Sequence, residues 1–245
     1  MFSQSSVSLG LQYFIQGWYL ISQKGLRRFV VMPILINILL LSATFFLLYT
    51  QTSYLIDKMM SYIPDWLSWL GGLLMALSIL LILIFFYFIF VTLAGFIAAP
   101  FNALLAEKVE EMLTGEIAHS QSAMDFIRDI PRIILREWQK LKYSLPRLFI
   151  LFLFSFIPLL GQSAIPILSF VFSAWLMAIQ YCDYPFDNHK ITFAQMKQQL
   201  AEKKLLSCTF GILVTCCTFI PLLNFVIIPV AVCGATVMWV EQFKQ

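Results

Sequence analysis

Charged residues are scarce in this chain, and long stretches contain none. Asp, Glu, Lys and Arg make up 12% of the 245 residues, apolar residues make up 60%, and the mean hydropathy is +0.85. Soluble domains contain ~25% charged and ~45 to 50% apolar residues, so this composition excludes an ordinary soluble domain. The longest stretches without charge are residues 66–106, 148–182 and 205–240. We therefore expect an all-α integral membrane protein, since helices satisfy their own backbone hydrogen bonds in lipid.

The chain also lacks the patterns that carry catalysis. Its two histidines, His119 and His189, have no HExxH or other metal-ligand spacing, and no P-loop, GxSxG or GxGxxG motif is present. Cys182 and His189 flank a proline loop but have no recognisable third partner. We predict no enzyme, cofactor or metal. Without a P-loop, any driving force comes from an ion gradient, the substrate gradient or a separate subunit.

The five cysteines are odd in number and show no CxxC spacing; they are Cys182, Cys208, Cys216, Cys217 and Cys233. Most lie in apolar segments, which favours buried reduced thiols over disulfides or a metal site. The first residues lack a basic region and a small-residue cleavage site, so a removable signal peptide is not expected.

A short pattern occurs twice in the C-terminal third. Phe-Ile-Pro-Leu-Leu at residues 156–160 recurs at residues 219–223, and a second proline follows each copy at Pro166 and Pro229. Each copy lies within a charge-free block and divides it into two apolar arms. An arm of ten residues rises only ~15 Å as a helix, about half of a ~30 Å hydrocarbon core. We therefore predict two proline-bent re-entrant hairpins, at 148–182 and 205–240, a pattern that points to a transport pathway.

The remaining segments complete a single membrane domain over residues 1–245. Residues 1–23 show helical periodicity with a polar face and are expected to form an amphipathic interfacial helix. Long apolar runs predict spanning helices at 24–56 and 66–106. Residues 107–147 are polar and predict cytoplasmic helices, and 183–204 predicts a cytoplasmic loop with a short helix.

The basic residues predict the orientation. With two spanning helices and two hairpins that return to their side of origin, every Lys and Arg except Lys58 lies on one side. The positive-inside rule makes that side cytoplasmic, with both termini there. A topology of six fully crossing helices places the same residues inside. The short length of the apolar arms favours two shallow hairpins over six fully crossing helices.

Residues 25–28, Gly-Leu-Arg-Arg, are the main candidate site. They combine two guanidinium groups, a glycine that lets backbone approach a ligand, and the start of a helix with outward N–H groups. Those features suit a tetrahedral oxyanion, because helix N-termini favour anions and arginine offers a planar fork. The alternative is a positively charged flank that binds lipid phosphates.

Further polar residues are candidates for a pathway. The helix carrying Arg128, Arg132, Arg136, Lys140, Lys142 and Arg147 either attracts anions to a vestibule or rests on anionic headgroups, which we favour. Glu107, Glu110 and Glu111 have three alternative roles: they pair with this basic helix, they carry a proton, or they form a solvated helix face. We favour the solvated face. Gln162, Ser163 and Asn224 lie near the hairpin bends and either line a path or bond structurally. The residues we single out for a pathway or gate are Glu107, Glu110, Arg128, Arg132, Gln162 and Asn224.

Several longer strings carry a family resemblance. They are Gly-Leu-Arg-Arg-Phe from Gly25, the run 98–107, Asp-Ile-Pro-Arg from Asp129, the run 136–140, Tyr-Cys-Asp-Tyr-Pro-Phe-Asp-Asn-His-Lys at 181–190, and the block 229–241. Together they resemble the CysZ sulfate permease family of the bacterial inner membrane, over about residues 13–241. The string at 181–190 is very specific.

The resemblance implies import of sulfate into the cytoplasm for assimilation into cysteine. It also implies a homo-oligomer with two long spanning helices and re-entrant hairpins, and a sulfate site at Gly25, Leu26, Arg27 and Arg28. The expected partners are sulfate, membrane lipids and further copies of the chain, but not nucleic acid. The main alternative is a membrane scaffold or accessory subunit that binds anionic lipid and assists another transporter. An intramembrane enzyme would need Cys182, His189 or the acidic cluster.

Overall fold

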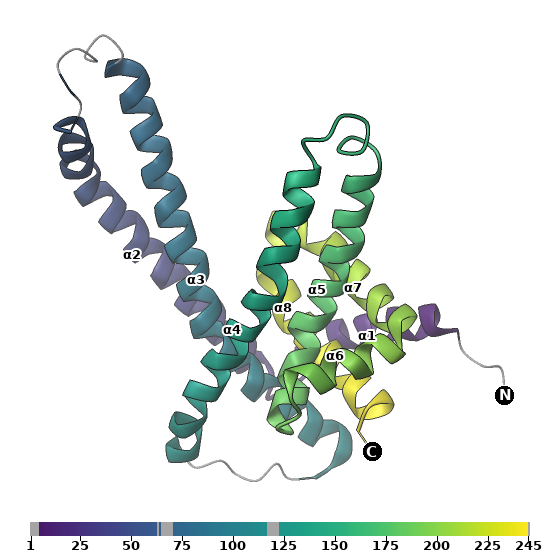
Figure 1. Cartoon of the computed structure of the whole chain (residues 1–245). Helices are drawn as coiled ribbons and strands as arrows, with labels where there is room; N and C mark the ends of the chain where they lie inside the picture. The colour runs from purple at the N-terminus through teal and green to yellow at the C-terminus, as the bar shows by residue number, and fades with distance from the viewer. Residues whose placement is uncertain (1–4, 63, 65–70, 117–122, 245) are drawn as a thin grey trace. The chain divides into compact units, whose positions relative to one another are not determined.

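A computed structural model describes residues 5–62, 64, 71–116 and 123–244, and within these ranges the regular structure is entirely helical. Eight helices follow one another along these ranges (Figure 1): α1 (Ser6–Ile21), α2 (Arg27–Met60), α3 (Gly71–Thr114), α4 (Ala123–Phe154), α5 (Ala164–Asn188), α6 (Phe193–Glu202), α7 (Lys204–Thr218) and α8 (Pro221–Gln242). The predicted all-α class is confirmed. The chain divides into two compact units, one of residues 1–31 with 99–245 and one of residues 32–98.

The larger unit has one hydrophobic core. Helix α1 packs mainly against α8 and α7, and α5 packs against α7 and α8. Phe186, Phe210 and Met238 are fully buried in this core. A Cβ at Gly211 would overlap the carbonyl oxygen of Ala174, so α5 and α7 approach backbone to backbone, as small residues permit between membrane helices.

Helix α1 is part of that core. Its N-cap is Ser5, whose side chain accepts a hydrogen bond from the backbone N–H of Ser8, and its buried face consists of Gly10, Tyr13, Phe14, Gly17 and Leu20. A separate row of apolar side chains on the same helix is exposed: Val7, Leu11, Ile15 and Tyr19. One face of α1 thus packs against α7 and α8, and the predicted interfacial position of this helix stays a prediction.

The smaller unit consists of the apolar parts of α2 and α3. Leu41, Phe45, Leu83 and Phe86 are among the side chains that line a cavity of about 160 Å³ between them. Many other large apolar side chains of this unit are exposed, including Phe46, Phe85 and Phe88. Such all-round hydrophobicity is typical of helices whose solvent is lipid.

Two helices within the described residues are long and apolar enough to cross a membrane. They are Met75–Thr114 of α3 and Ala164–Asn188, which is α5. The first overlaps the predicted span at 66–106, of which residues 66–70 lie outside the described residues. The second is one arm of the predicted first hairpin. Within α2 the apolar helix is the shorter stretch Leu35–Gln51.

The chain turns at both proline-bearing positions. Residues 155–163 join α4 to α5, and Phe219 and Ile220 join α7 to α8, which begins at Pro221. The arm that begins at Leu148 ends at Phe154 and is the last part of α4, a helix that begins at Ala123 and continues through Pro131 and Pro146. Lys142 and Arg147 precede this arm, so its charge-free part is short. The length argument for a shallow first hairpin therefore does not hold for α5, which is long and apolar enough to cross a membrane. Re-entry into the bilayer stays a prediction for both hairpins.

Candidate functional site

Gly25–Arg28 forms the junction between α1 and α2. Gly25 has a φ of +102°, a left-handed value that favours glycine, and a Cβ built there would contact nothing within 4 Å. Leu26 is fully buried in the core of the larger unit, whereas Gly25, Arg27 and Arg28 are exposed. A buried leucine between exposed neighbours fixes this short loop to the core. The two arginines then begin α2.

Arg27 is positioned by its own backbone surroundings. Its Nε and Nη2 donate to the carbonyl oxygen of Ser22, at 3.2 and 3.1 Å. These contacts hold the guanidinium on the C-cap residue of α1. Helix α2 begins at Arg27, and the leading N–H groups of a helix have no intrahelical acceptor. Arg27 Nη1 takes no part in the contacts with Ser22. The junction thus combines a held guanidinium, a second exposed arginine and helix-end N–H groups, which together suit an oxyanion.

The string at 181–190 forms the end of α5 and faces the basic residues of α4. Arg136 Nε lies 2.6 Å from Asp183 Oδ1, and Lys140 Nζ lies 3.3 Å from Asp183 Oδ2. Lys140 also bonds Glu137 at 2.6 Å. Burial alone would lower the pKa of Lys140, but the Asp183 carboxylate, with help from Glu137, raises it above its usual range. Arg136, Lys140 and Asp183 therefore form a buried charged cluster.

A second ion pair continues this cluster by one helical turn. Arg132 Nη1 lies 2.6 Å from Asp187 Oδ1 and also donates to the Asp187 carbonyl, while Nη2 contacts Asp129 at 2.9 Å. The favoured interpretation of α4 as a helix on lipid headgroups does not describe Arg132, Arg136 and Lys140, which bind α5 instead. Arg128 is exposed.

Neutral side chains of the same string hold the last part of α3. The Tyr184 hydroxyl accepts from Asn102 Nδ2 at 3.2 Å and from Gln180 Nε2 at 3.3 Å. Asn188 Nδ2 donates to the carbonyl oxygen of Ala103 at 2.9 Å. The string therefore links α3, α4 and α5 within the larger unit, which explains why it is so polar at the end of an apolar helix.

Glu110 pairs with residues that the sequence analysis did not predict as its partners. Its carboxylate lies 2.9 Å from His189 Nε2 and 3.0 Å from Lys244 Nζ. Glu110 is buried, so it is neither a solvated side chain nor a partner of the basic helix. It connects α3 to the loop after α5 and to the C-terminal residues. Lys244 also bonds Glu116 at 2.6 Å.

Two candidate pathway residues do meet. Glu107 and Arg132 line one small cavity of about 10 Å³, together with Asp129 and Asn188. A cavity of this size holds about one water molecule. Arg132 Nε is buried and has no acceptor among the described residues, so a water there would satisfy it. These residues form a small polar cavity near the end of α3, which is not an open channel.

The other candidates lie apart from this cavity. Gln162 and Ser163 are exposed in the turn between α4 and α5, and the Ser163 hydroxyl donates to the carbonyl oxygen of Leu159 at 2.6 Å. Asn224 belongs to α8, and its side chain lies outside the described residues. Among the residues described here, no group of three or more His, Cys, Asp or Glu side chains is placed to hold a metal ion.

Sequence reasoning missed the pairing of α4 with α5. A usable signal was the shared spacing, since Arg132 and Arg136 are four residues apart and so are Asp183 and Asp187. Side chains four apart lie on one helix face, so the two pairs match when the helices are antiparallel.

One comparison with known proteins bears on these residues. The sequence model of the family described as "Sulfate transporter CysZ/Etoposide-induced protein 2.4" matches residues 13–229. The match covers most of the chain. It includes the Gly25–Arg28 junction, α3, the charged cluster of α4 and α5, and the first residues of α8.

Proposed function

Because this chain belongs to the sulfate transporter CysZ/etoposide-induced protein 2.4 family, we propose that it imports sulfate across the bacterial inner membrane. The imported sulfate would supply assimilation into cysteine. The family assignment supports a membrane transport role, and the apolar helices α3 and α5 agree with it. The proposal adds three points to the family assignment: that the substrate is sulfate, that transport is inward, and that the membrane is the bacterial inner membrane.

In this proposal, Gly25, Leu26, Arg27 and Arg28 bind the sulfate dianion. The single observation that carries this assignment is the junction geometry. Gly25 takes the left-handed conformation, and the Arg27 guanidinium is held on the Ser22 carbonyl at the start of α2. Sulfate would accept from the remaining guanidinium N–H groups and from the first amides of α2. Binding must be moderate, because a site that holds an ion too tightly does not release it.

The hairpins supply the route in this proposal. Their turns carry exposed large apolar side chains, including Phe156, Leu159 and Phe219, and no charged residue. Exposed apolar groups of this kind mark surfaces that contact lipid or protein. Helix α7 rises only ~22 Å, less than the ~30 Å hydrocarbon thickness, whereas α8, of 22 residues, rises ~33 Å, so the length argument for re-entry of the second hairpin rests on α7 alone. Several copies of the chain would enclose the conduit.

Uptake by purified protein in liposomes tests the proposal. Vesicles that contain the protein should accumulate radiolabelled sulfate faster than empty vesicles, and excess unlabelled sulfate should compete. An Arg27→Ala/Arg28→Ala variant, reconstituted to the same protein content, should take up no more than empty vesicles. Vesicles with wild-type protein that are no more permeable than empty ones would contradict autonomous transport.

The same experiment separates the proposal from the accessory-subunit alternative. An accessory subunit would give flux only after a second protein is added, and its lipid binding would depend on the exposed basic residues of α4. Arg128 is exposed, but Arg132, Arg136 and Lys140 are engaged with carboxylates, which leaves fewer charges for headgroups. This observation weighs against lipid binding through these three residues, and the flux measurement separates the two proposals.

A further inference from the structure

Two basic side chains meet on one aromatic ring of the larger unit. The guanidinium carbon of Arg147 lies 4.0 Å from the centre of the Tyr143 ring, and Lys197 Nζ lies 4.5 Å from the same centre. A cation within ~6 Å of a ring centre is attracted to the negative face of the ring. Arg147 belongs to α4 and Lys197 to α6, so the packing of these helices brings the two charges together. We call Tyr143, Arg147 and Lys197 the basic-aromatic cluster.

Contacts from three helices fix the members of this cluster. The Tyr143 hydroxyl accepts a hydrogen bond from Trp175 Nε1 of α5 at 3.2 Å, and its ring meets the Phe193 ring of α6 edge-on at 6.0 Å. Arg147 Nη1 donates to the Tyr143 carbonyl oxygen at 2.6 Å. Lys197 is half-buried and also lies 5.0 Å from the Phe193 ring centre. Both cations are therefore held at defined positions, with N–H groups left to bind a ligand.

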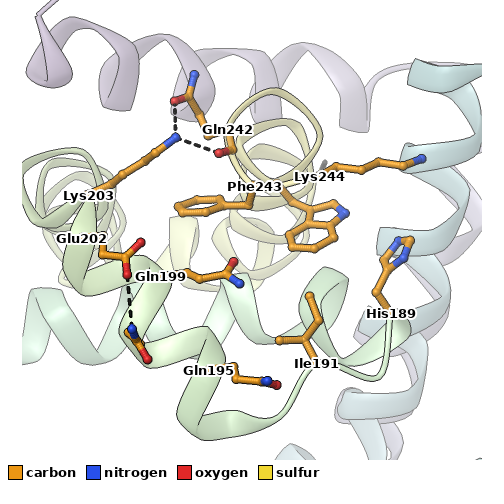
Figure 2. A pocket seen from close by; sticks show the side chains of 11 residues that line it. His189, Ile191, Gln195, Gln199, Glu202, Lys203, Gln242, Phe243 and Lys244 are labelled. Carbon is orange, nitrogen blue, oxygen red and sulfur yellow. Dashed lines mark hydrogen bonds between the residues drawn. The ribbon is translucent and has the colours of Figure 1, made fainter.

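The surface around the cluster is positive. Within the described residues, neither Arg147 nor Lys197 makes an ion pair with a carboxylate. Residues 141–182 and 188–201 contain no Asp or Glu. Glu202, the first acidic residue after Lys197, is five positions further along α6 and so does not share its helix face. It accepts a hydrogen bond from Gln198 at 3.4 Å and lines a different pocket beside Lys203 (Figure 2).

The cluster lies where α4 changes from polar to apolar. Arg147 is the last charged residue before the charge-free block of the first predicted hairpin. Ile150 and Phe154, three and seven residues further on, share its helix face and are 50% and 46% exposed. In a membrane protein such a face contacts lipid, so the cluster lies at the level of the headgroups. Its tyrosine and Trp175 are of the two residue types enriched at that level.

We propose that Arg147 and Lys197 bind the phosphate of an anionic phospholipid, whose acyl chains lie on the exposed apolar face of α4. The guanidinium and ammonium groups suit phosphate oxygens, and basic pockets between membrane helices bind such headgroups. A choline headgroup carries a cation that the two positive charges repel, whereas phosphatidylglycerol carries none. The bound lipid connects α4 to α6 and stabilises the folded protein by linkage. The cluster shares no residue with the Gly25–Arg28 junction, so it is independent of the sulfate proposal.

Thermal unfolding and native mass spectrometry of the full-length protein in a neutral detergent test this site. Added dioleoylphosphatidylglycerol should raise Tm saturably, and more than dioleoylphosphatidylcholine does. Arg147→Gln and Lys197→Gln should each weaken phosphatidylglycerol binding about fivefold, the contribution of one basic residue near an anionic membrane surface. The double variant should weaken it further and retain fewer lipid molecules in the mass spectrum.

Matched variants separate a defined site from general charge attraction. Arg128→Gln removes one charge at an exposed position of α4 that is 19 residues, or ~28 Å, before Arg147, and should bind phosphatidylglycerol as the wild type does. Tyr143→Leu removes the ring but keeps both charges and should weaken binding. Tyr143→Phe loses the hydrogen bond from Trp175 but keeps the ring face, so its affinity should stay close to that of the wild type.

Four results would each overturn the proposal. They are equal Tm shifts with the two lipids, equal losses in Arg128→Gln and Arg147→Gln, equal affinities of Tyr143→Leu and Tyr143→Phe, and equally strong binding of sn-glycerol 3-phosphate, which has no acyl chains. Sulfate binding should persist in the Arg147→Gln/Lys197→Gln variant. Its loss there would assign the two cations to the anion path instead of to lipid, and would also contradict the proposal.

Discussion

Arg136 Nε lies 2.6 Å from Asp183 Oδ1, and both side chains are buried between α4 and α5. Its other guanidinium contacts include the Ile191 carbonyl at 2.8 Å and the Met196 sulfur at 3.9 Å. A single arginine thus joins α4 to the end of α5, to the following loop and to α6. The cluster around it organises the polar end of the larger unit.

Breaking this pair should destabilise the protein strongly. Among the described residues, Arg136→Gln leaves Asp183 one ion pair, the 3.3 Å contact to Lys140, and removal of one partner from a buried pair costs ~3 to 5 kcal/mol. We expect a marked fall in Tm of the detergent-solubilised protein. Arg128→Gln, which makes the same change at an exposed position of α4, should unfold close to the wild-type Tm. Equal Tm values for the two variants would contradict the importance of the pair.

The pKa of Lys140 predicts a particular pH dependence. A pKa raised in the folded state gives a stabilising contribution that is fully present below the unfolded value of ~10.4 and is lost as pH rises through the folded pKa. The Tm difference between wild type and Lys140→Met should therefore stay constant from about pH 6 to about pH 9 and shrink above about pH 10.5. A difference that already disappears below about pH 9 would mean that Asp183 does not hold this lysine charged.

Gly25 should tolerate a side chain poorly although there is room for one. Its φ of +102° costs a non-glycine residue ~1 to 3 kcal/mol, while a Cβ would meet no atom within 4 Å. We expect Gly25→Ala to lower both Tm and sulfate affinity, because the loop shifts to relieve the strain. Gly95→Ala is the matched control, since its Cβ also meets open space but Gly95 is in an ordinary helix. Its Tm should equal or exceed that of the wild type.

Sulfate binding should depend on the shape of Arg27 as well as its charge. Arg27→Lys keeps the positive charge but cannot donate two hydrogen bonds to the Ser22 carbonyl, so the cation is no longer held on the C-cap residue of α1. We expect about tenfold weaker binding by calorimetry, which corresponds to the loss of roughly one charge-assisted hydrogen bond. Lys24→Ala, an exposed neighbour outside the junction, should bind sulfate normally. Full affinity in Arg27→Lys would remove the role of guanidinium geometry.

Cysteine labelling in cells tests the orientation and the hairpins together. In a background with the five native cysteines replaced by alanine, Ala194→Cys of α6 should react with a membrane-impermeant maleimide only after the cytoplasmic side is opened. Lys58→Cys, the one basic position predicted outside, should react in intact cells. Both positions are exposed in the folded chain, so accessibility within the protein does not separate them. Labelling of Ala194→Cys in intact cells would show a differently threaded chain.

Local sequence signals predicted the helices well and their partners poorly. The repeated Phe-Ile-Pro-Leu-Leu located both turns, and the apolar run before Glu107 located α3, because these patterns act within a few residues. The ends of α4 were not predictable from its prolines alone, since Pro146 lies inside the helix rather than at its end. Proline disfavours a helix interior, but surrounding packing overrides that preference.

The same distinction between local and long-range features applies to the candidate site. The loop and helix start at Gly25–Arg28 could be predicted because a glycine followed by a helix start is a local pattern, and the left-handed φ of Gly25 agrees with it. Sulfate binding there stays a prediction. The contacts of Arg136 with Asp183 and of Glu110 with His189 join residues far apart in the chain. Only the arrangement of α3, α4 and α5 brings them together, so charge counts alone led to lipid headgroups and solvent as partners.

The backbone contact between Gly211 and Ala174 limits how transport can work. Helix α5 belongs to the first hairpin and α7 to the second, and no side chain separates them at this point. Interlocked surfaces of this kind do not slide without losing many close contacts at once. We therefore expect α5 and α7, and with them the two predicted hairpins, to move together rather than to slide past each other at this contact.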